Sequence, residues 1–391
     1  MKTENSKKIC SACGTSPVNH NVLFIYNLIN ETLGSLGGFF FNFSQSKNIA
    51  NQAEIVINKF LSIIGFVRFN DNIEKATSGR SKLIWQEAQK RGIKMQQLVI
   101  WGKYIENYRA KINGKMYYFE SIPIPPWFPQ GGYGWIDDKF KLSKKLKKAN
   151  INSPKTYTIH NIKNTKKNFH LLTKPVIIKP KNGSRGRHTT TNINTEKEAV
   201  EAFLLANKIS PFLVIQEHLF GSVYRATVID GKLVGFFRAD PPFVTGNSKQ
   251  NIEELILEKN KTKDEKLSEI LINEELINFI GRENYNLKSV LPEGKTLYLI
   301  AKTGRMYGGY TKEMLPEVHP KMHEIFKEAG KVANVPVAGF DLIIEDPTKD
   351  PDTQRWGIIE CNSLPFLDLH YFALEGKPLN LAENVWDLWN K

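Results

Sequence analysis

The sequence predicts an α+β protein with more than one domain. The chain has 391 residues, and at roughly 100–200 residues per domain this length indicates two or three domains. Hydrophobic residues make up 41% of the chain, which is enough for a sizeable core. Helix-like and strand-like runs alternate along the chain. Two strand pairs turn at Asn-Gly and Asp-Gly, which are typical of β-hairpins.

The first 20 residues are polar and are expected to form a loop-like or disordered tail. They contain Cys10 and Cys13 in a CxxC pattern, with His20 nearby. A zinc site usually needs four ligands, and no second pair follows at a usable spacing. The sequence therefore favours an unstructured or simply packed tail, and a metal role for the two cysteines stays open.

Residues 21–135 are expected to form an N-terminal α/β region. The periodicity of residues 81–91 predicts a helix, and residues 108–119 predict a hairpin around an Asn-Gly turn. The Pro-rich segment 121–134 then interrupts the pattern. We place a domain boundary there.

Residues 136–391 form the second part of the chain and begin with a Lys-rich helix at 137–149. Thr195 and Glu198 have the spacing of a capping box and begin a second helix. Its inward residues are expected to be Ala199, Val200, Phe203 and Leu204. The other expected elements are strands at 175–180 and 212–217, a hairpin over 224–238 turning at Asp230-Gly231, a charged helical region at 251–286, strands at 296–302, 337–344 and 356–362, and a helix at 319–332.

The formal charge of +14 raises the question of a nucleic-acid partner. Residues 139–187 contain 13 Lys, two Arg and no acid. Clustered cations can bind the phosphates of a nucleic acid or of a nucleotide. Lys, Asn and Ile are also abundant along the whole chain, which fits a coding bias. Composition alone favours the bias, and we do not expect a nucleic-acid partner.

A cationic loop with two glycines follows the strand at 175–180. Gly183 and Gly186 let backbone N–H groups approach phosphate oxygens, and Lys179 can add a positive charge. The loop lacks the Walker spacing, so an ordinary surface loop is an equally good interpretation.

Three residues near the C-terminus suit a metal ion. Asp341 lies in one apolar strand, and Glu360 and Asn362 lie in another. Residues two apart on a strand point to the same face, so Glu360 and Asn362 are expected together and Cys361 away from them. Oxygen ligands of this kind suit Mg²⁺. Solvent-facing acids on an amphipathic hairpin are the alternative.

The order of these motifs, from about residue 137 to the C-terminus, resembles the ATP-grasp ligases. The matching segments are the Gly-rich loop, IQEHLFG, YRATVIDGKLVGFFRADPPFVTGNSKQNIEELI, GFDLII and IECNSLPFLDLH. Their pattern is most similar to the ATP-grasp domain of cyanophycin synthetases and related glutathione-forming enzymes. The resemblance implies two α+β lobes that grip ATP, a small lobe at about 170–220 and a metal-binding lobe at about 221–391.

The resemblance also implies roles for individual residues. Lys139 and Lys179 match lysines that contact the ATP phosphates. The mobile loop over the triphosphate corresponds to Gly183, Ser184, Arg185 and Gly186, and the hinge that holds adenine corresponds to Gln216, Glu217, His218 and Leu219. The second glycine of that loop's motif is replaced by His188.

The remaining implied roles concern catalysis, metal and substrate. Arg225 and Arg238 match arginines that face an acyl phosphate or a carboxylate, and Arg305 is a further catalytic candidate. The two Mg²⁺ ions, with Mn²⁺ as an alternative, would be held by Asp341, Glu360 and Asn362. Contacts to substrate are assigned to His370 and, from the N-terminal region, to Arg80.

The function implied is an ATP-dependent carboxylate–amine ligase that acts through an acyl phosphate on amino-acid or small-peptide substrates. One alternative is an ATP-grasp enzyme that adds amino acids to a protein or peptide. Another, of a different class, is a non-enzymatic basic protein that binds polyanions.

The expected location is the cytoplasm, with no membrane partner. No run approaches the roughly 18 apolar residues of a membrane-spanning helix, and the N-terminus lacks a signal-peptide apolar region. Three cysteines are few, which fits a reducing compartment. Whether the chain forms a homo-oligomer stays open.

Overall fold

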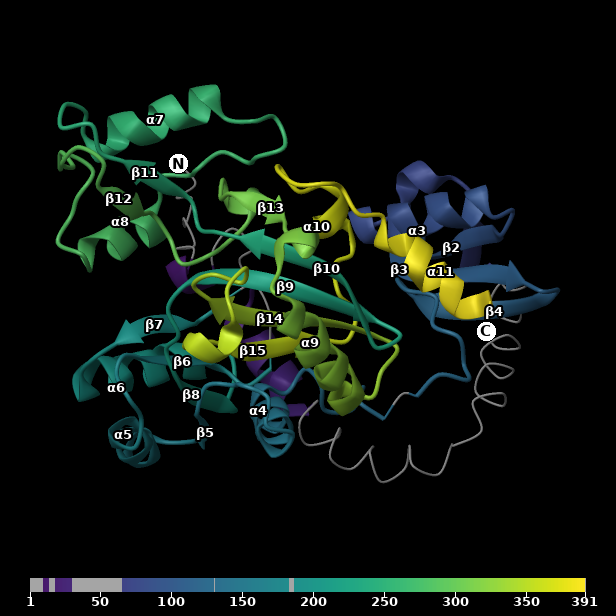
Figure 1. Ribbon diagram of the computed structural model, residues 1–391, viewed down its shortest axis with the longest axis horizontal. Helices are drawn as coiled ribbons and strands as arrows, with labels where there is room; N and C mark the ends of the chain where they lie inside the picture. Colours follow the sequence, from purple (N-terminus) through teal and green to yellow (C-terminus); the bar gives the residue numbers. More distant parts are fainter. Residues whose placement is uncertain (1–9, 14–17, 30–64, 130, 183–185, 391) are drawn as a thin grey trace, which may run out of the picture.

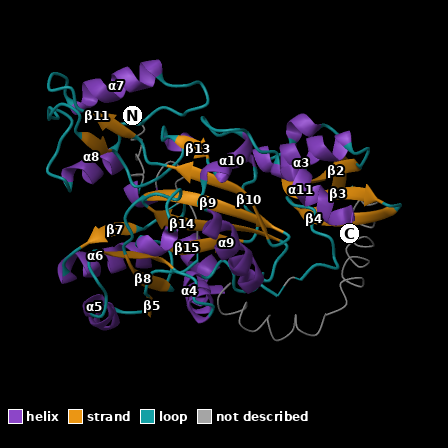
Figure 2. Ribbon diagram, in the orientation of Figure 1, coloured by secondary structure: helices purple, strands orange, loops and turns teal. Residues whose placement is uncertain are grey.

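The computed structural model describes residues 10–13, 18–29, 65–129, 131–182 and 186–390. Within these residues the strands form four sheets, and every pair of neighbouring strands is antiparallel. Helices pack on the sheets or beside them (Figure 2). The predicted α+β class is therefore confirmed. Among the described helices, none has the length and apolarity to cross a membrane.

The N-terminal unit is a four-stranded sheet with two helices beside it. Its strands, in sheet order, are β1 (Val67–Asn70), β2 (Lys94–Ile100), β3 (Lys103–Ile112) and β4 (Lys115–Glu120). The predicted helix is α3 (Gly79–Lys90), and the Asn113-Gly114 turn joins β3 to β4 with positive φ angles. The second helix, α11 (Leu381–Asp387), comes from the C-terminus and packs against α3 (Figure 1). A helix from the C-terminus thus completes the hydrophobic core of the N-terminal unit.

The small lobe is a second four-stranded sheet. Its strands, in sheet order, are β5 (Thr156–Ile159), β8 (Leu213–Glu217), β6 (Val176–Pro180) and β7 (Thr190–Ile193). The helices α5 (Ile162–His170) and α6 (Glu196–Asn207) pack together and on this sheet. The lobe begins at β5, before the expected start near residue 170, because β5 pairs with β8 at its edge.

Helix α6 begins with the capping box that the sequence predicts. The Thr195 side chain accepts from the Glu198 N–H, and the Glu198 carboxylate accepts from the Thr195 N–H. Ala199 and Phe203 are buried as expected, but Leu204 is 50% exposed. The prediction for Leu204 is therefore wrong, because Ala202 and Ala206 complete the buried stripe instead.

The central sheet has five strands and links the other parts of the molecule. Its strands, in sheet order, are β13 (Thr311–Glu313), β10 (Lys232–Ala239), β9 (Ser222–Ile229), β14 (Val337–Ile344) and β15 (Gly357–Asn362). One face packs against α9 (Pro320–Ala333), where Tyr224, Phe236 and Phe340 join Phe326 in one core. Helix α4 (Lys139–Lys148) contacts β15 and β5, and so connects this sheet to the small lobe.

A smaller unit lies beside the central sheet, at the upper left of Figure 1. It contains β11 (Phe243–Thr245), β12 (Thr296–Tyr298), α7 (Ile252–Thr262) and α8 (Glu274–Gly281), around its own apolar core. The strand expected at 296–302 is thus shorter, and the helical region splits in two. The remaining short helices are η2 (Ile73–Lys75), η3 (Arg305–Tyr307), η4 (Leu315–Glu317), η5 (Pro351–Thr353), α10 (Asp368–Tyr371) and η6 (Leu388–Asn390).

The N-terminal segment has regular structure where it is described. Ser11–Cys13 form the short helix η1, and residues 20–29 are helical. Asn27 donates from Nδ2 to the Ile209 carbonyl at 2.8 Å, and η1 lies against α8. Within the expected loop-like tail over residues 1–20, the described residues 10–13 thus make tertiary contacts.

Candidate active site

Three charged side chains lie in one row across three neighbouring strands of the central sheet. In the strand register Arg225 of β9 is opposite Asp341 of β14, which is opposite Glu360 of β15. Directly opposed residues point to the same face. The neighbouring residue Cys361 is buried in the core of the other face, as strand alternation predicts.

The next row of the same face contains the third predicted metal ligand. Thr227, Gly339 and Asn362 are opposite one another on the same three strands. A Cβ on Gly339 would lie 2.9 Å from Arg225 Nη1 and 2.6 Å from Pro365 Cβ, so only glycine leaves room for the arginine here. The sheet thus brings together Asp341, Glu360 and Asn362, as the sequence predicts.

Two lysines approach this row from the small-lobe side. Lys139 is the first residue of α4 and lies with Nζ 3.2 Å from Glu360 Oε2. The helix begins there because Asp138 caps it, accepting from the N–H groups of residues 140 and 141. Asp138 Oδ2 also lies 3.2 Å from Lys181 Nζ, which links the start of α4 to the end of β6.

Lys179 shares a face of the small-lobe sheet with the predicted hinge residue Gln216. Ile177 and Lys179 are two apart on β6, and Ile177 is opposite Gln216 of β8. The alternate residues of the strand, Val176 and Ile178, are buried against α5 and α6 in the core of the lobe. Alternation therefore directs Lys179 and Gln216 to the other face, away from the helices.

The site buries groups of opposite charge close together, and this shifts their pKa values. Burial raises the pKa of Asp341 to about 7, although Arg225 opposes this rise. Burial would also raise the pKa of Glu360, but the positive charge of Lys139, with other contributions, lowers it to about 2. Burial and the nearby charge of Lys139 lower the pKa of Lys179 to about 8. The two carboxyls therefore differ strongly in proton affinity.

Arg225 is held in place by Asp341 and still has a donor to offer. Its Nε and Nη2 donate to the two carboxylate oxygens of Asp341, the second at 2.8 Å. Its third nitrogen, Nη1, is buried and has no hydrogen-bond partner among the described residues. A buried guanidinium N–H without a partner is costly and suits an anionic oxygen of a ligand.

The four predicted hinge residues differ in their contacts and burial. The amide of Gln216 donates from Nε2 to Thr156 Oγ1 at 2.8 Å, while its buried Oε1 finds no donor in the described part of the chain. Glu217 is directed elsewhere, with a carboxylate oxygen 3.6 Å from Arg355 Nη2. His218 is half-buried, and burial lowers its pKa. Leu219 is 4% exposed and packs near Gly357.

The Gly-rich loop is described only at its C-terminal end. The candidates Gly183, Ser184 and Arg185 lie outside the described residues. Gly186 has a φ of 61°, a left-handed conformation that favours glycine. Its Cα faces Lys302, since a Cβ there would lie 3.9 Å from Lys302 Cγ.

The other two catalytic candidates lie away from the charged row. A β-bulge between Leu233 and Gly235 places Phe237, rather than Arg238, on the same face as Arg225. Arg238 lies with Nε 2.8 Å from Asp240 Oδ2 and stacks on Tyr310. Without the bulge the two-residue turn would bring both arginines to one face. The expectation that they act together is therefore corrected.

Arg305 also has a different environment. It belongs to η3, and its guanidinium lies over the ring of Phe372, 4.9 Å from the ring centre. Its positive charge lowers the pKa of Asp368, which burial otherwise raises.

Both substrate candidates are engaged within the protein. His370 is fully buried, with Nε2 2.7 Å from Thr227 Oγ1 and Nδ1 2.5 Å from Glu313 Oε2. A fully buried ring with both nitrogens bonded cannot contact a substrate, so the assignment of His370 is corrected to a structural role. Its position over Gly235 shows how it packs: a Cβ there would lie 2.5 Å from Nδ1.

Arg80 joins the N-terminal unit to the segment that follows β15. Its guanidinium donates to the carbonyls of Leu364 and Pro365 and, at 2.6 Å, to Ser121 Oγ. The residue is 6% exposed, and burial lowers the pKa of its guanidinium. The expectation of a substrate contact is thus replaced by a role in holding this segment.

The donor set fits Mg²⁺. Two carboxylates and one amide lie on one face, and oxygen ligands of this kind are those that Mg²⁺ takes. The buried Nδ2 of Asn362 has no hydrogen-bond partner among the described residues. Such an amide is free to direct its oxygen to a cation.

Sequence reasoning missed one further acid of this site. Burial raises the pKa of Asp137, whose carboxylate accepts from the N–H and the hydroxyl of Ser363 at 3.2 and 3.0 Å. This contact fixes the chain directly after Asn362. The adjacent pair of acids before Lys139 was the only signal in the sequence.

Two surface depressions, one between α5 and α6 and one beside Leu219 and Trp356, contain none of the metal candidates.

Comparison with known proteins shows what this chain is similar to. Residues 136–247 match the family model described as an ATP-grasp domain. The structure is similar to a bifunctional glutathione synthetase from Pasteurella multocida, with a TM-score of 0.54 and 21% identity over 79% of this chain and 43% of that one. Residues 136–247 thus match an ATP-grasp domain, and the structure has the ATP-grasp fold, as the resemblance predicted.

Two curated relatives illustrate the sequence similarity. A cyanophycin synthetase of Geminocystis herdmanii is 33% identical over 223 residues, which cover 55% of this chain and 25% of the relative. A glutathione biosynthesis bifunctional protein of Clostridium perfringens is 28% identical over 262 residues, which cover 65% of this chain and 34% of the relative. The chain thus spans about a quarter to a third of the length of these relatives.

Proposed function

We propose that this chain is an ATP-dependent carboxylate–amine ligase that forms an amide through an acyl phosphate. The observation that carries the proposal is the row Arg225–Asp341–Glu360, with Lys139 paired to Glu360 from the small-lobe side. The match to the ATP-grasp domain supports ATP as the nucleotide. The relatives are named for the synthesis of glutathione and cyanophycin, which supports amino-acid or peptide substrates.

ATP would lie between the small lobe and the central sheet. The buried Oε1 of Gln216, which finds no donor among the described residues, suits the exocyclic amine of adenine. Lys139 and Lys179 would contact the phosphates, and the triphosphate charge would favour the protonated form of Lys179. Within the cationic run over residues 139–187, Lys139 and Lys179 would then face a nucleotide rather than a nucleic acid.

Mg²⁺, or Mn²⁺ in its place, would be held by Asp341, Glu360 and Asn362. Together these side chains offer enough oxygen atoms for two ions. When bound, the metal supplies charge neutralisation at the phosphates. The contribution of the chain is to favour the ionised form of both carboxylates on a rigid sheet. Lys139 lowers the pKa of Glu360, and Arg225 opposes the rise that burial causes in the pKa of Asp341.

The proposed reaction has two steps. In the first, an oxygen of the substrate carboxylate attacks the γ-phosphorus of ATP, the bond to the β,γ-bridging oxygen breaks, and ADP leaves. In the second, an amine nitrogen attacks the acyl carbon, the carbon–oxygen bond to phosphate breaks, and the amine loses a proton. Arg225 Nη1 suits the anionic oxygens of the acyl phosphate. Positioning and charge neutralisation supply most of the rate enhancement in phosphoryl transfer.

The test is phosphate release from MgATP in the presence of amino acids, supplied singly and in pairs. We expect release that depends on one carboxylate and one amine, and a loss of roughly 100-fold or more in Asp341→Asn, by analogy with removing one electrostatic contact to a transition state. The matched control is Asp352→Asn, whose side chain is 71% exposed and which should keep the wild-type rate.

The variant Asp341→Asn leaves Arg225 without its anionic partner, so its folding must be checked. Circular dichroism should show that the variant is folded. The proposal fails if no pair of substrates stimulates release. It also fails if folded Asp341→Asn is as active as Asp352→Asn.

A further inference from the structure

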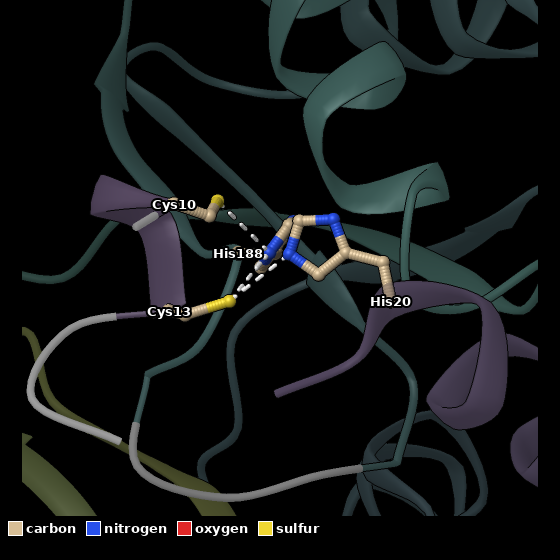
Figure 3. A group of neighbouring side chains, drawn as sticks. All are labelled: Cys10, Cys13, His20 and His188. Carbon is tan, nitrogen blue, oxygen red and sulfur yellow. Dashed lines mark hydrogen bonds between the residues drawn. The ribbon is translucent and has the colours of Figure 1, made fainter. Parts of the chain in front are cut away.

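Four potential metal ligands meet between the N-terminal segment and the small lobe. They are Cys10, Cys13, His20 and His188, which we call the Cys₂His₂ cluster, and their ligand atoms all lie within 4.8 Å of one another. Cys13 Sγ lies 3.1 Å from His20 Nε2 and 3.4 Å from His188 Nε2, and Cys10 Sγ lies 3.7 Å from His188 Nε2. Figure 3 shows the four side chains pointing toward a common centre.

The backbone positions these side chains with its own hydrogen bonds. The two cysteines are joined by a short turn, in which the Cys13 N–H donates to the Cys10 carbonyl at 3.0 Å. The His188 N–H donates to the Ala12 carbonyl at 3.0 Å, so the CxxC turn and the chain after the Gly-rich loop are bonded together. His20 begins the helix at 20–29. Three separate pieces of chain thus converge on one point.

The orientation of His188 is fixed in the way that metal-binding histidines require. Its Nδ1–H donates to the Leu205 carbonyl at 2.7 Å, because a carbonyl can only accept. The lone pair therefore lies on Nε2, which faces both cysteine sulfurs. A hydrogen bond from the second ring nitrogen to a backbone carbonyl is the usual support of a histidine ligand. The ring itself is 1% exposed.

Three of the four sulfur–nitrogen distances fit a tetrahedral ion. Zn–S bonds of about 2.3 Å and Zn–N bonds of about 2.0–2.1 Å give sulfur–nitrogen edges of about 3.5 Å in a tetrahedron. The three measured sulfur–nitrogen distances, 3.1, 3.4 and 3.7 Å, lie around this value. Two thiolates and two imidazoles are a ligand set that selects Zn²⁺ over hard cations such as Mg²⁺.

We propose that the Cys₂His₂ cluster binds one zinc ion, which fastens the N-terminal segment to the small lobe. The bond from Asn27 to the Ile209 carbonyl places the segment against the small lobe, and η1 also contacts α8 of the unit that contains β11 and β12. Cys10 and Cys13 are free thiols in the structure, as a zinc site needs. The fourth ligand is 168 positions or more away from the other three along the chain, so the ion would join two parts that the sequence keeps apart.

The site also lies at the end of the Gly-rich loop, since His188 is two residues beyond Gly186. The zinc ion would therefore fix this end of the loop. Any effect of zinc loss on the KM for ATP would depend on the proposed function. The zinc site itself does not depend on it.

The experiment measures metal in the purified full chain by elemental mass spectrometry. We expect one zinc per chain, and less than a tenth of that in Cys13→Ser and in His188→Gln. The matched control is His160→Gln, whose histidine is exposed and outside the cluster and which should keep its zinc. Replacement with Co²⁺ should give the absorption bands of a tetrahedral ion with thiolate ligands in the wild type and in His160→Gln only.

The proposal is overturned if the wild type binds no zinc, or if Cys13→Ser and His188→Gln keep as much as His160→Gln. A cobalt spectrum without thiolate bands, or a Cys10–Cys13 disulfide in protein that still carries full activity, would overturn it as well. Metal content is measured without turnover. Failure of the zinc site is therefore distinguishable from failure of the ligase.

Discussion

In the candidate active site, burial and neighbouring charges together set the pKa values of the charged side chains. Asp341 and Glu360 are neighbours in the sheet register, yet burial raises the pKa of the first to about 7, while Lys139 chiefly lowers that of the second to about 2. Two carboxylates that share a buried face cannot both be ionised without cations. Lys139 and Arg225 supply part of that positive charge, and the proposed metal would supply the rest.

The shifted pKa of Lys179 predicts a pH dependence of nucleotide binding. Burial lowers this pKa to about 8, so the amine is charged below pH 8 and loses its proton as the pH rises further. ATP prefers the charged form, and binding above pH 8 must then take up one proton. The Kd for MgATP should rise by up to about tenfold per pH unit above 8. Calorimetry in buffers of different ionisation enthalpy measures the proton uptake directly.

The matched control is Lys179→Arg, which keeps a positive charge at all these pH values. It should bind MgATP without taking up a proton. Equal proton uptake by Lys179→Arg and the wild type would show that another group titrates.

Single residues differ in how far the sequence predicted their roles. The row of acids was predictable, because strand alternation depends only on the local pattern. Arg238 was not, since the extra residue of the bulge at Leu233–Gly235 reverses which face it occupies. His370 was misassigned because its burial depends on Thr227 and Glu313, which are distant in the sequence.

Helices and strands direct adjacent side chains to different environments, and α6 shows this clearly. Phe203 and Leu204 are neighbours, but Phe203 is 4% exposed in the core of the small lobe and Leu204 is 50% exposed. The sequence pattern predicted both inward. It could not distinguish them, because alanines at 202 and 206 complete the stripe and are small enough to escape notice.

This difference predicts unequal effects of two neighbouring substitutions. Phe203→Ala should destabilise the small lobe by about 3–5 kcal/mol, through the cavity that it leaves. Leu204→Ala should change stability by no more than about 0.5 kcal/mol, as is usual for surface positions, and it is the matched control. Hydrogen exchange of the amides of β6 and β8 measures the stability of this lobe separately. Equal effects of the two variants would contradict the assigned faces.

At the scale of the molecule, the site is formed by parts that lie far apart in the chain. The small lobe supplies Lys179 and Gln216, α4 supplies Lys139, and the central sheet supplies Arg225 and the acids. The C-terminal helix α11 completes the N-terminal unit, with Trp386 donating from Nε1 to the Ile84 carbonyl at 2.9 Å. Arg80 then ties that unit to the segment after the acids.

Much of this architecture was predictable, because collinear motifs carried the resemblance to the ATP-grasp ligases. The Cys₂His₂ cluster was not. A CxxC pair and one histidine gave three ligands, and the fourth stands 175 residues beyond Cys13, where only the folded chain brings it near. The contacts of the N-terminal segment were not predictable for the same reason, since they are tertiary rather than local.

The most direct test of the central claim, that the site phosphorylates a carboxylate, follows the fate of an oxygen atom. The amino-acid or peptide substrate found by the phosphate-release assay is labelled with ¹⁸O in its carboxylate and incubated with MgATP and the amine. We predict ADP together with phosphate that carries one ¹⁸O, because the carboxylate oxygen attacks the γ-phosphorus and leaves with the phosphate. Unlabelled phosphate, or ¹⁸O in AMP, would contradict the acyl-phosphate mechanism.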